Sequence, residues 1–308
     1  MSYVGPDFDP PQPRRLRRGP LTVALAALVP GALIGWFVYE AVGGPGDSSG
    51  SAAGNTSSAS STASGAPASP TGTASNDDKP PGPSPLKGKV VVIDPGHNVT
   101  NFQHTAEINR KVDIGTNWKE CDTTGTSTNA GYSEAQFTMD VSHRLKALLE
   151  KQGVTVKLTH DTGSPSWGPC VDQRARFGND AHADAALSIH ADGAPAGDHG
   201  FHVILPASVH AGGADTRAIV GPSAVLGRGI ASNYRRVTGE PFSNYVGDGT
   251  GLDTRKDLGG LNLSTVPKVF IECGNMRDSN DAALLTNGAW RQKAAQGISE
   301  GIVSFLRG

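Results

Sequence analysis

The chain has 308 residues, with 27 basic and 29 acidic side chains and a formal net charge of −2. This balance argues against a protein that binds nucleic acid through bulk basicity. Glycine and proline are abundant, at 40 and 21 residues, but they follow no three-residue period, which excludes a collagen-like chain.

The N-terminal segment has the pattern of a membrane anchor. Residues 1–20 are polar and carry four clustered arginines just before the uncharged apolar run 21–39. A helix over that run would be about 28 Å long, close to the ~30 Å hydrocarbon core of a bilayer. We therefore predict a single transmembrane signal anchor at 21–42, with 1–20 in the cytoplasm. A cleaved secretory signal is the alternative, and either pattern exports the rest of the chain.

A linker and a single catalytic domain are expected after the anchor. Residues 43–86 consist mostly of glycine, serine, alanine, threonine and proline, with no large apolar side chain before Leu86. Such a segment cannot bury enough apolar surface to offset the entropy of ordering, which predicts a disordered linker. The remaining residues, 87–308, are numerous enough to form one hydrophobic core.

Predicted strands and helices alternate through this domain. Short β-branched apolar runs indicate strands, and longer amphipathic runs indicate helices. The alternation predicts an α/β domain in which helices flank a mostly parallel, twisted sheet. The strands are expected at 87–97, 154–160, 184–192, 200–206 and 266–275, and the helices at 133–152, 171–183, 217–237 and 289–306.

Polar side chains at three strand ends predict a site at one edge of the sheet, where ligands bind in such folds. His97, His190 and Glu272 each end or follow an apolar run. Glu134 lies on the apolar stripe of helix 133–152, where a carboxylate must pair, bind a metal or reach water at the helix end. Two histidines and a glutamate suit Zn²⁺ with one open position, and Glu272 is placed to act as a general base.

Four motifs in this order carry a family resemblance. They are IDPGH at 93–97, a helix bearing Glu134, RARFGNDAHADAALSIHAD at 174–192 and VFIECGNM at 269–276. Together they resemble the zinc-dependent N-acetylmuramoyl-L-alanine amidases of the Amidase_3 type, over essentially all of 88–308.

The resemblance implies a function and a role for each site residue. The two histidines and Glu134 would hold the zinc ion, and Glu272 would be the catalytic carboxylate. The implied reaction is hydrolysis of the amide between N-acetylmuramic acid and L-alanine in peptidoglycan, for remodelling or recycling of the cell wall. Glu107 and Glu120, in the unusual segment 98–132, are alternatives to Glu134.

Further contacts are expected around this site from position alone. Asp94, which precedes the Pro-Gly turn, is a candidate for orienting His97 from behind. Arg255, Asn275 and His202 are candidates for contacts with the substrate.

The cysteines and two long loops complete the expectations. Cys121 and Cys170 lie in irregular loops of an exported domain and are expected to form a disulfide, which would contribute about 3–4 kcal/mol. Cys273, at a buried strand end, is the alternative of a cysteine nucleophile. Segments 98–132 and 206–222 are candidates for an extended groove or a regulatory lid.

Two other functions remain open. The domain is either an active enzyme or a catalytically inactive peptidoglycan-binding or regulatory module on the same fold. A zinc hydrolase acting on another amide, such as a deacetylase, would use the same metal and base. The expected partners are peptidoglycan and the membrane, without nucleic acid, and no activator protein is identified. We expect the catalytic domain to face the cell wall from the cell membrane, or to be secreted if the anchor is cleaved.

Overall fold

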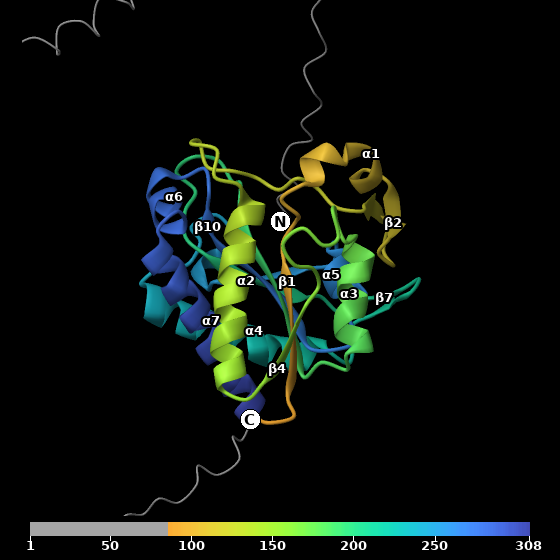
Figure 1. The fold of residues 1–308 in the computed structure, drawn as a ribbon. Helices are drawn as coiled ribbons and strands as arrows, with labels where there is room; N and C mark the ends of the chain where they lie inside the picture. Colours follow the sequence, from red (N-terminus) through yellow and green to blue (C-terminus); the bar gives the residue numbers. More distant parts are fainter. Residues whose placement is uncertain (1–85) are drawn as a thin grey trace, which may run out of the picture. The chain divides into compact units, whose positions relative to one another are not determined.

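The computed structural model describes residues 86–308 (Figure 1). Apart from Leu86, the predicted anchor at 21–42 and linker at 43–86 lie outside these residues. Within 86–308, none of the helices combines the length and the apolar character that crossing a membrane requires.

A six-stranded sheet forms the centre of the domain, in the order β4-β1-β5-β10-β6-β9. Neighbouring strands are parallel except for β10 and β6, which confirms the predicted mostly parallel sheet. The strands are β1 (Val90–Pro95), β4 (Thr155–Leu158), β5 (Ala185–Asp192), β6 (His202–Pro206), β9 (Leu252–Arg255) and β10 (Lys268–Asn275).

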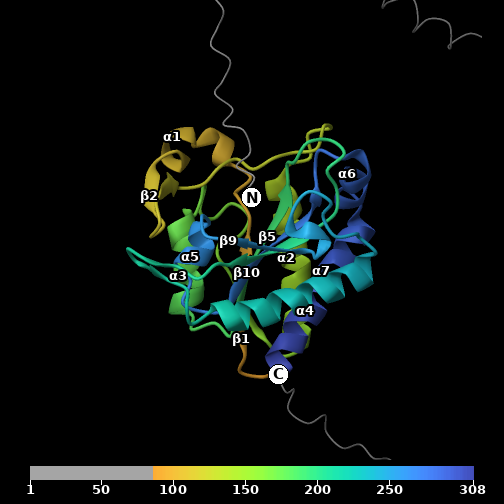
Figure 2. The same ribbon diagram turned by 180° about the vertical axis from the view of Figure 1, so that it is seen from behind.

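Helices cover both faces of the sheet. Figures 1 and 2 show α3 and α5 on the opposite side of β1 from α2 and α7. Val91 and Ile93 of β1 join the large core beneath α2, α4 and α7, whereas Val92 joins a smaller cluster on the other face. This alternation follows from the two-residue repeat of a strand. The long helices are α2 (Glu134–Lys151), α3 (Val171–Asp180), α4 (Val220–Thr238) and α7 (Gly288–Arg307).

Smaller elements decorate this frame, and the sequence did not predict them. Two hairpins arise in the long loops 98–132 and 206–222, and β9 adds an edge strand. The remaining elements are η1 (Asn101–Gln103), α1 (Thr105–Ile108), β2 (Lys111–Asp113), β3 (Trp118–Glu120), β7 (His210–Ala211), β8 (Ala214–Asp215), η2 (Gly247–Gly249), α5 (Gly259–Asn262) and α6 (Ser279–Leu285).

The start of α2 is fixed by a capping box. The Ser133 side chain accepts a hydrogen bond from the Gln136 backbone, and the Gln136 side chain accepts one from the Ser133 backbone. This arrangement satisfies backbone groups that a helix end leaves unpaired. A buried stripe that includes Phe137 and Val141 then packs α2 on the sheet. Glu134 is thereby held in the first turn, above the sheet edge.

Two buried carboxyl groups, those of Asp281 and Glu240, connect three segments of the chain near this edge of the sheet. Oδ2 of Asp281 accepts hydrogen bonds from the backbone of Gly200, at 2.9 Å, and of Asn275, at 2.8 Å. Glu240 is buried beside Asp281. Burial, together with the charge of Asp281, raises the pKa of Glu240 to about 8. The folded protein therefore keeps a proton on Glu240 at neutral pH.

This proton makes stability depend on pH. Between about pH 4.5 and 8 the folded state binds more protons at Glu240 than the unfolded state, so this residue lowers the free energy of unfolding as pH rises. Glu240→Gln should remove this part of the decline in the free energy of unfolding. Its free energy of unfolding should be closest to that of the wild type near pH 5. Urea unfolding across pH 5–9 measures the effect, with Glu150→Gln on the exposed face of α2 as the control. Equal pH slopes for wild type and Glu240→Gln would contradict it.

Candidate metal centre

Three predicted ligands meet at one end of the sheet. His97 follows β1, His190 lies in β5, and Glu134 begins α2. The candidate donor atoms of these residues all lie within 4.8 Å of one another. Nε2 of His97 is 3.1 Å from Oε2 of Glu134, and Nδ1 of His190 is 2.9 Å from Oε1 of the same carboxylate. Glu134 thus bridges two imidazoles whose ring centroids are 5.0 Å apart.

Two glycines allow this close approach. A Cβ atom at Gly96 would lie 2.5 Å from the His190 ring. Gly125 has a φ of 72°, and a Cβ atom there would lie 2.7 Å from both Oε2 of Glu134 and the ring of His97. Side chains at these two positions would push the donors apart, so the compact site depends on glycine at both.

The donor set and its electrostatics fit a divalent cation. Although burial opposes it, the charges of Glu134 and Asp122 raise the pKa of His97 well above its usual range. Burial would raise the pKa of Glu134, but His97 and His190 lower it below its usual value. A positive charge is therefore stabilised among these atoms. Two imidazoles and a carboxylate about 3 Å apart are compatible with zinc bonds of about 2.0–2.2 Å.

The alternative glutamates lie elsewhere. Glu107 is an exposed residue 3.5 Å from Nδ1 of His104. Glu120 forms an ion pair with Lys111 across the β2–β3 hairpin. Neither belongs to the donor cluster found among the described residues. Glu134 is the carboxylate that the fold brings to the two histidines.

Asp122 orients His97, and this corrects the prediction for Asp94. Oδ1 of Asp122 lies 3.3 Å from Nδ1 of His97. Arg174 donates hydrogen bonds to Oδ2 of Asp122, at 2.8 Å, to the backbone oxygen of His97, at 3.0 Å, and to Oδ1 of Asp94, at 2.7 Å. Asp94 therefore acts on the histidine only through Arg174. Asp122 follows Cys121 directly, and nothing in the sequence showed that this loop returns to the strand end.

Asp94 has a different position because its side chain is buried within the sheet. It accepts hydrogen bonds from Ser188 and Thr159, both at 2.6 Å. Nζ of Lys268 lies 3.9 Å from it. Burial disfavours its charge, but the cations Arg174 and Lys268 lower the pKa of Asp94 below its usual value. The charge is thus compensated inside the domain, as a buried carboxylate requires.

Glu272 is half-buried, and one of its carboxylate oxygens has no hydrogen-bond partner among the described residues. It lies opposite His190 on one neighbouring strand and opposite His202 on the other. Its Oε2 atom is buried and unpartnered among the described residues. Burial, followed by the charges of Asp192 and Glu134, raises the pKa of Glu272 well above its usual range. A buried carboxylate oxygen without a partner costs stability, and such groups are typical of functional sites.

The structure corrects the prediction for Asn275. This residue is fully buried, and its amide nitrogen donates to the backbone oxygens of Ala194, Pro195 and Asp198, at 2.6–3.1 Å. It therefore holds the loop after β5 and has no exposed surface to offer a substrate. Position near the strand end did not reveal this, because the loop that it holds is distant in the sequence.

Arg255 and His202 lie near Glu272, on the strands β9 and β6. Arg255 is partly exposed and forms two hydrogen bonds with Asp257, at 2.7 and 2.9 Å. His202 is 3 % exposed, and burial lowers its pKa to about 4, so it is neutral. Its ring meets Tyr245 edge-on, and the Tyr245 hydroxyl donates to Asp192 at 2.8 Å. Contact of Arg255 and His202 with the substrate stays a prediction.

The cysteines separate into a structural pair and a buried thiol. Cys121 and Cys170 form the predicted disulfide. Cys273 is buried, and that burial raises the pKa of its thiol well above the usual value. It also alternates with Glu272 along β10, so the two side chains leave opposite faces of the strand. A cysteine nucleophile at this position is therefore not supported.

The long segment 98–132 contributes to the metal centre directly. Besides Asp122 and Gly125, it supplies the backbone N–H of Thr126, which donates to Oε2 of Glu134 at 3.0 Å. Whether this segment or 206–222 acts as a lid stays a prediction.

Comparisons with known proteins agree with this geometry. The family model described as N-acetylmuramoyl-L-alanine amidase, Amidase_3, matches residues 91–304. The chain is 41% identical to the N-acetylmuramoyl-L-alanine amidase Rv3717 of Mycobacterium tuberculosis over 226 residues, 73% of this chain and 89% of the relative.

Two solved structures are also similar. The crystal structure of the N-acetylmuramyl-L-alanine amidase Ami1 from Mycobacterium smegmatis has a TM-score of 0.66 and 38% identity, over 72% of this chain and 98% of that one. The apo form of Ami1 from Mycobacterium abscessus gives the same TM-score and identity, over 72% of this chain and 100% of that one.

The role of Asp122 can be tested through metal affinity. Asp122→Asn keeps the shape of the side chain but removes the charge that faces His97, and should weaken zinc binding about 10–100-fold. Competition with a chromogenic chelator measures the affinity. Asp161→Asn is the control, because Asp161 is exposed and contacts His143 instead. Unchanged zinc affinity in Asp122→Asn would contradict the orienting role.

Proposed function

The chain belongs to the N-acetylmuramoyl-L-alanine amidase family, and from this membership we propose how its residues act. The enzyme hydrolyses the amide between N-acetylmuramic acid and L-alanine in peptidoglycan. Zinc is the cofactor, with His97, Glu134 and His190 as ligands, and Glu272 is the acid–base residue. The observation that carries this proposal is the cluster of three donor side chains beside the unpartnered carboxyl of Glu272.

Zinc and Glu272 have separate roles in the hydrolysis. When bound, zinc supplies Lewis acidity toward the amide carbonyl and toward a water molecule. Glu272 takes a proton from the attacking water as its oxygen bonds to the carbonyl carbon. Glu272 then gives that proton to the L-alanine nitrogen as the carbon–nitrogen bond breaks. Glu272 is placed for this role because it lies opposite the ligand His190 on the neighbouring strand.

The orientation of the ligands is prepared by their surroundings. Asp122 fixes the ring of His97 from one side, while the ring of His190 stacks on Phe270, with centroids 5.3 Å apart. Glu134 also accepts the Ala191 backbone N–H, at 3.2 Å. These contacts favour a preformed site, which lowers the cost of ordering ligands when the metal binds.

The location of the enzyme belongs to the same proposal. The anchor at 21–42 and the linker at 43–86 would tether the catalytic domain outside the cell membrane, facing the cell wall. A cleaved signal would release it instead. The disulfide between Cys121 and Cys170 supports an oxidising compartment, since such bonds are rare in the cytosol.

Replacement of Glu272 tests the mechanism. Glu272→Gln should lower the amidase rate about 10²–10⁴-fold, because the side chain can no longer accept a proton, while zinc stoichiometry stays the same. The assay digests purified peptidoglycan and detects, by mass spectrometry, new L-alanine amino termini on intact stem peptides. Glu150→Gln, an exposed carboxylate on α2, should retain full activity.

The opposing outcomes are distinct. Equal rates for wild type and Glu272→Gln would exclude Glu272 as the acid–base residue. A wild-type protein that binds zinc and peptidoglycan without cleaving it would favour the inactive binding or regulatory module.

A further inference from the structure

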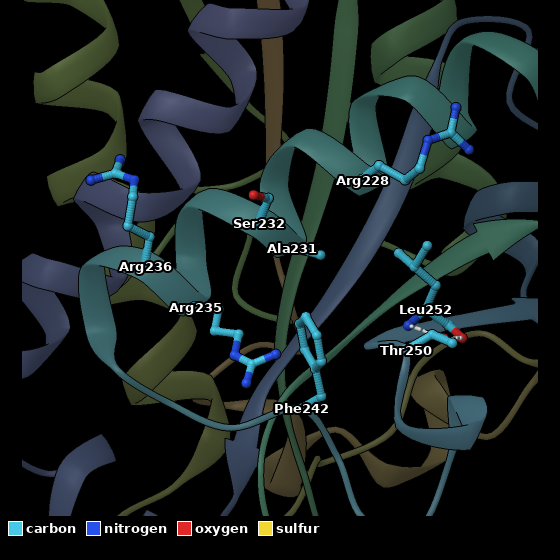
Figure 3. Close-up of a pocket in the computed structure, with 8 residues that line it drawn as sticks. All are labelled: Arg228, Ala231, Ser232, Arg235, Arg236, Phe242, Thr250 and Leu252. Carbon is cyan, nitrogen blue, oxygen red and sulfur yellow. Dashed lines mark hydrogen bonds between the residues drawn. The ribbon is translucent and has the colours of Figure 1, made fainter.

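A pocket lies between α4 and the edge strand β9, away from the donor cluster. Its volume is about 600 Å³. Figure 3 shows Arg235 extending from α4 toward the ring of Phe242, and Leu252 facing the helix. Arg228 and Arg236 lie on α4 at the two ends of the pocket lining. The residues that line it include three arginines and no aspartate or glutamate. The pocket therefore combines a positive rim with an apolar floor.

Two of these arginines have charges that no carboxylate balances. Within 86–308, Arg236 pairs with Glu300, whereas neither Arg228 nor Arg235 forms an ion pair. The guanidinium of Arg235 lies over the Phe242 ring, 4.4 Å from its centroid. Arginines in the last helical turn are favoured by the helix dipole, but Arg228 lies in the middle of α4, where that effect is absent. The site thus offers an anion two guanidinium groups that no carboxylate within 86–308 neutralises.

The spacing of the arginines indicates what kind of anion fits. Arg228 and Arg235 are seven residues apart, or about 10 Å along the helix. An extended peptide covers that distance in about three residues. Guanidinium groups bind carboxylates with two parallel hydrogen bonds, and Phe242 and Leu252 would contact small apolar side chains. The pocket suits an alanine-rich peptide with carboxylates two or three residues apart.

We propose that this pocket binds the acidic stem peptide of a peptidoglycan strand, which rests on the proposed substrate of the enzyme. The pocket and the metal centre lie on opposite faces of the sheet edge. Leu252 of β9 pairs with Val203 of β6, and the Val203 side chain faces Gly227 of α4. The preceding residue of β6, His202, lies opposite Glu272 of β10, so these two side chains point to the other face of the sheet. The bound peptide therefore belongs to a neighbouring stem, and the pocket retains the enzyme on polymeric substrate.

The two sites share one connecting segment. Phe242 and Leu252 stand at either end of the loop 243–251, within which Tyr245 donates its hydrogen bond to Asp192 beside the metal centre. Phe242 also packs on Phe201, with ring centroids 5.3 Å apart. A peptide held in the pocket would thus rest on a loop that also contacts Asp192 beside the metal centre.

A binding measurement on the full-length protein tests the proposal. The probe is the synthetic tetrapeptide L-alanyl-γ-D-glutamyl-L-lysyl-D-alanine, compared with the same peptide carrying amidated carboxyl groups. The double variant Arg228→Gln, Arg235→Gln should weaken tetrapeptide binding at least about tenfold and slow digestion of insoluble peptidoglycan. Its rate on a small soluble muramyl peptide should equal that of the wild type.

Controls separate this proposal from the proposed function. Arg176→Gln on α3, which removes the same kind of charge from the opposite face, should change neither measurement. Unchanged tetrapeptide binding in the double variant, or equal binding of the amidated peptide, would overturn the proposal. The proposal would also be overturned if the double variant lost binding to a glycerol phosphate polymer instead of binding to the peptide. Failure of the wild type to cleave the soluble muramyl peptide would contradict the proposed function instead.

Discussion

One buried guanidinium group connects the central sheet to the metal centre. Arg174 donates to Asp94 inside the sheet, to Asp122 behind His97, and to the backbone oxygen of His97 itself. Without it, the buried carboxylates of Asp94 and Asp122 would each lose a charged hydrogen-bond donor, and removing one partner of a buried ion pair typically costs several kcal/mol. The position of His97 therefore depends on a charge network that reaches into the core.

The disulfide makes this network possible. Cys170 is the residue before α3, which carries Arg174, and Cys121 precedes Asp122. The bond joins these two segments across a separation of 49 residues. It therefore stabilises the fold, by about 3–4 kcal/mol on chain-entropy grounds, and also fixes Asp122 where it meets His97. Segment 98–132 is thus part of the site and not only an insertion beside it.

Much of this could be predicted from the sequence, because the relevant signals are local. The ends of apolar strands indicated His97, His190 and Glu272, and the apolar stripe of a helix indicated Glu134. The fold brings all four residues to one edge of the sheet. Contacts between distant loops left no local signal. Asp122 therefore went unnoticed, and the side chain of Asn275 was assigned to substrate although it holds a loop. The edge strand β9 was missed because it is only four residues long, and the antiparallel direction of β6 was not predicted because a short strand carries no mark of its direction.

Zinc K-edge absorption spectroscopy of the purified, zinc-loaded protein tests the central claim most directly. We predict two imidazole nitrogens and at least one oxygen at about 2.0–2.2 Å, without sulfur, and one imidazole fewer in His190→Ala. A sulfur scatterer near 2.3 Å, or a wild-type spectrum unchanged by His190→Ala, would contradict a centre built from His97, Glu134 and His190.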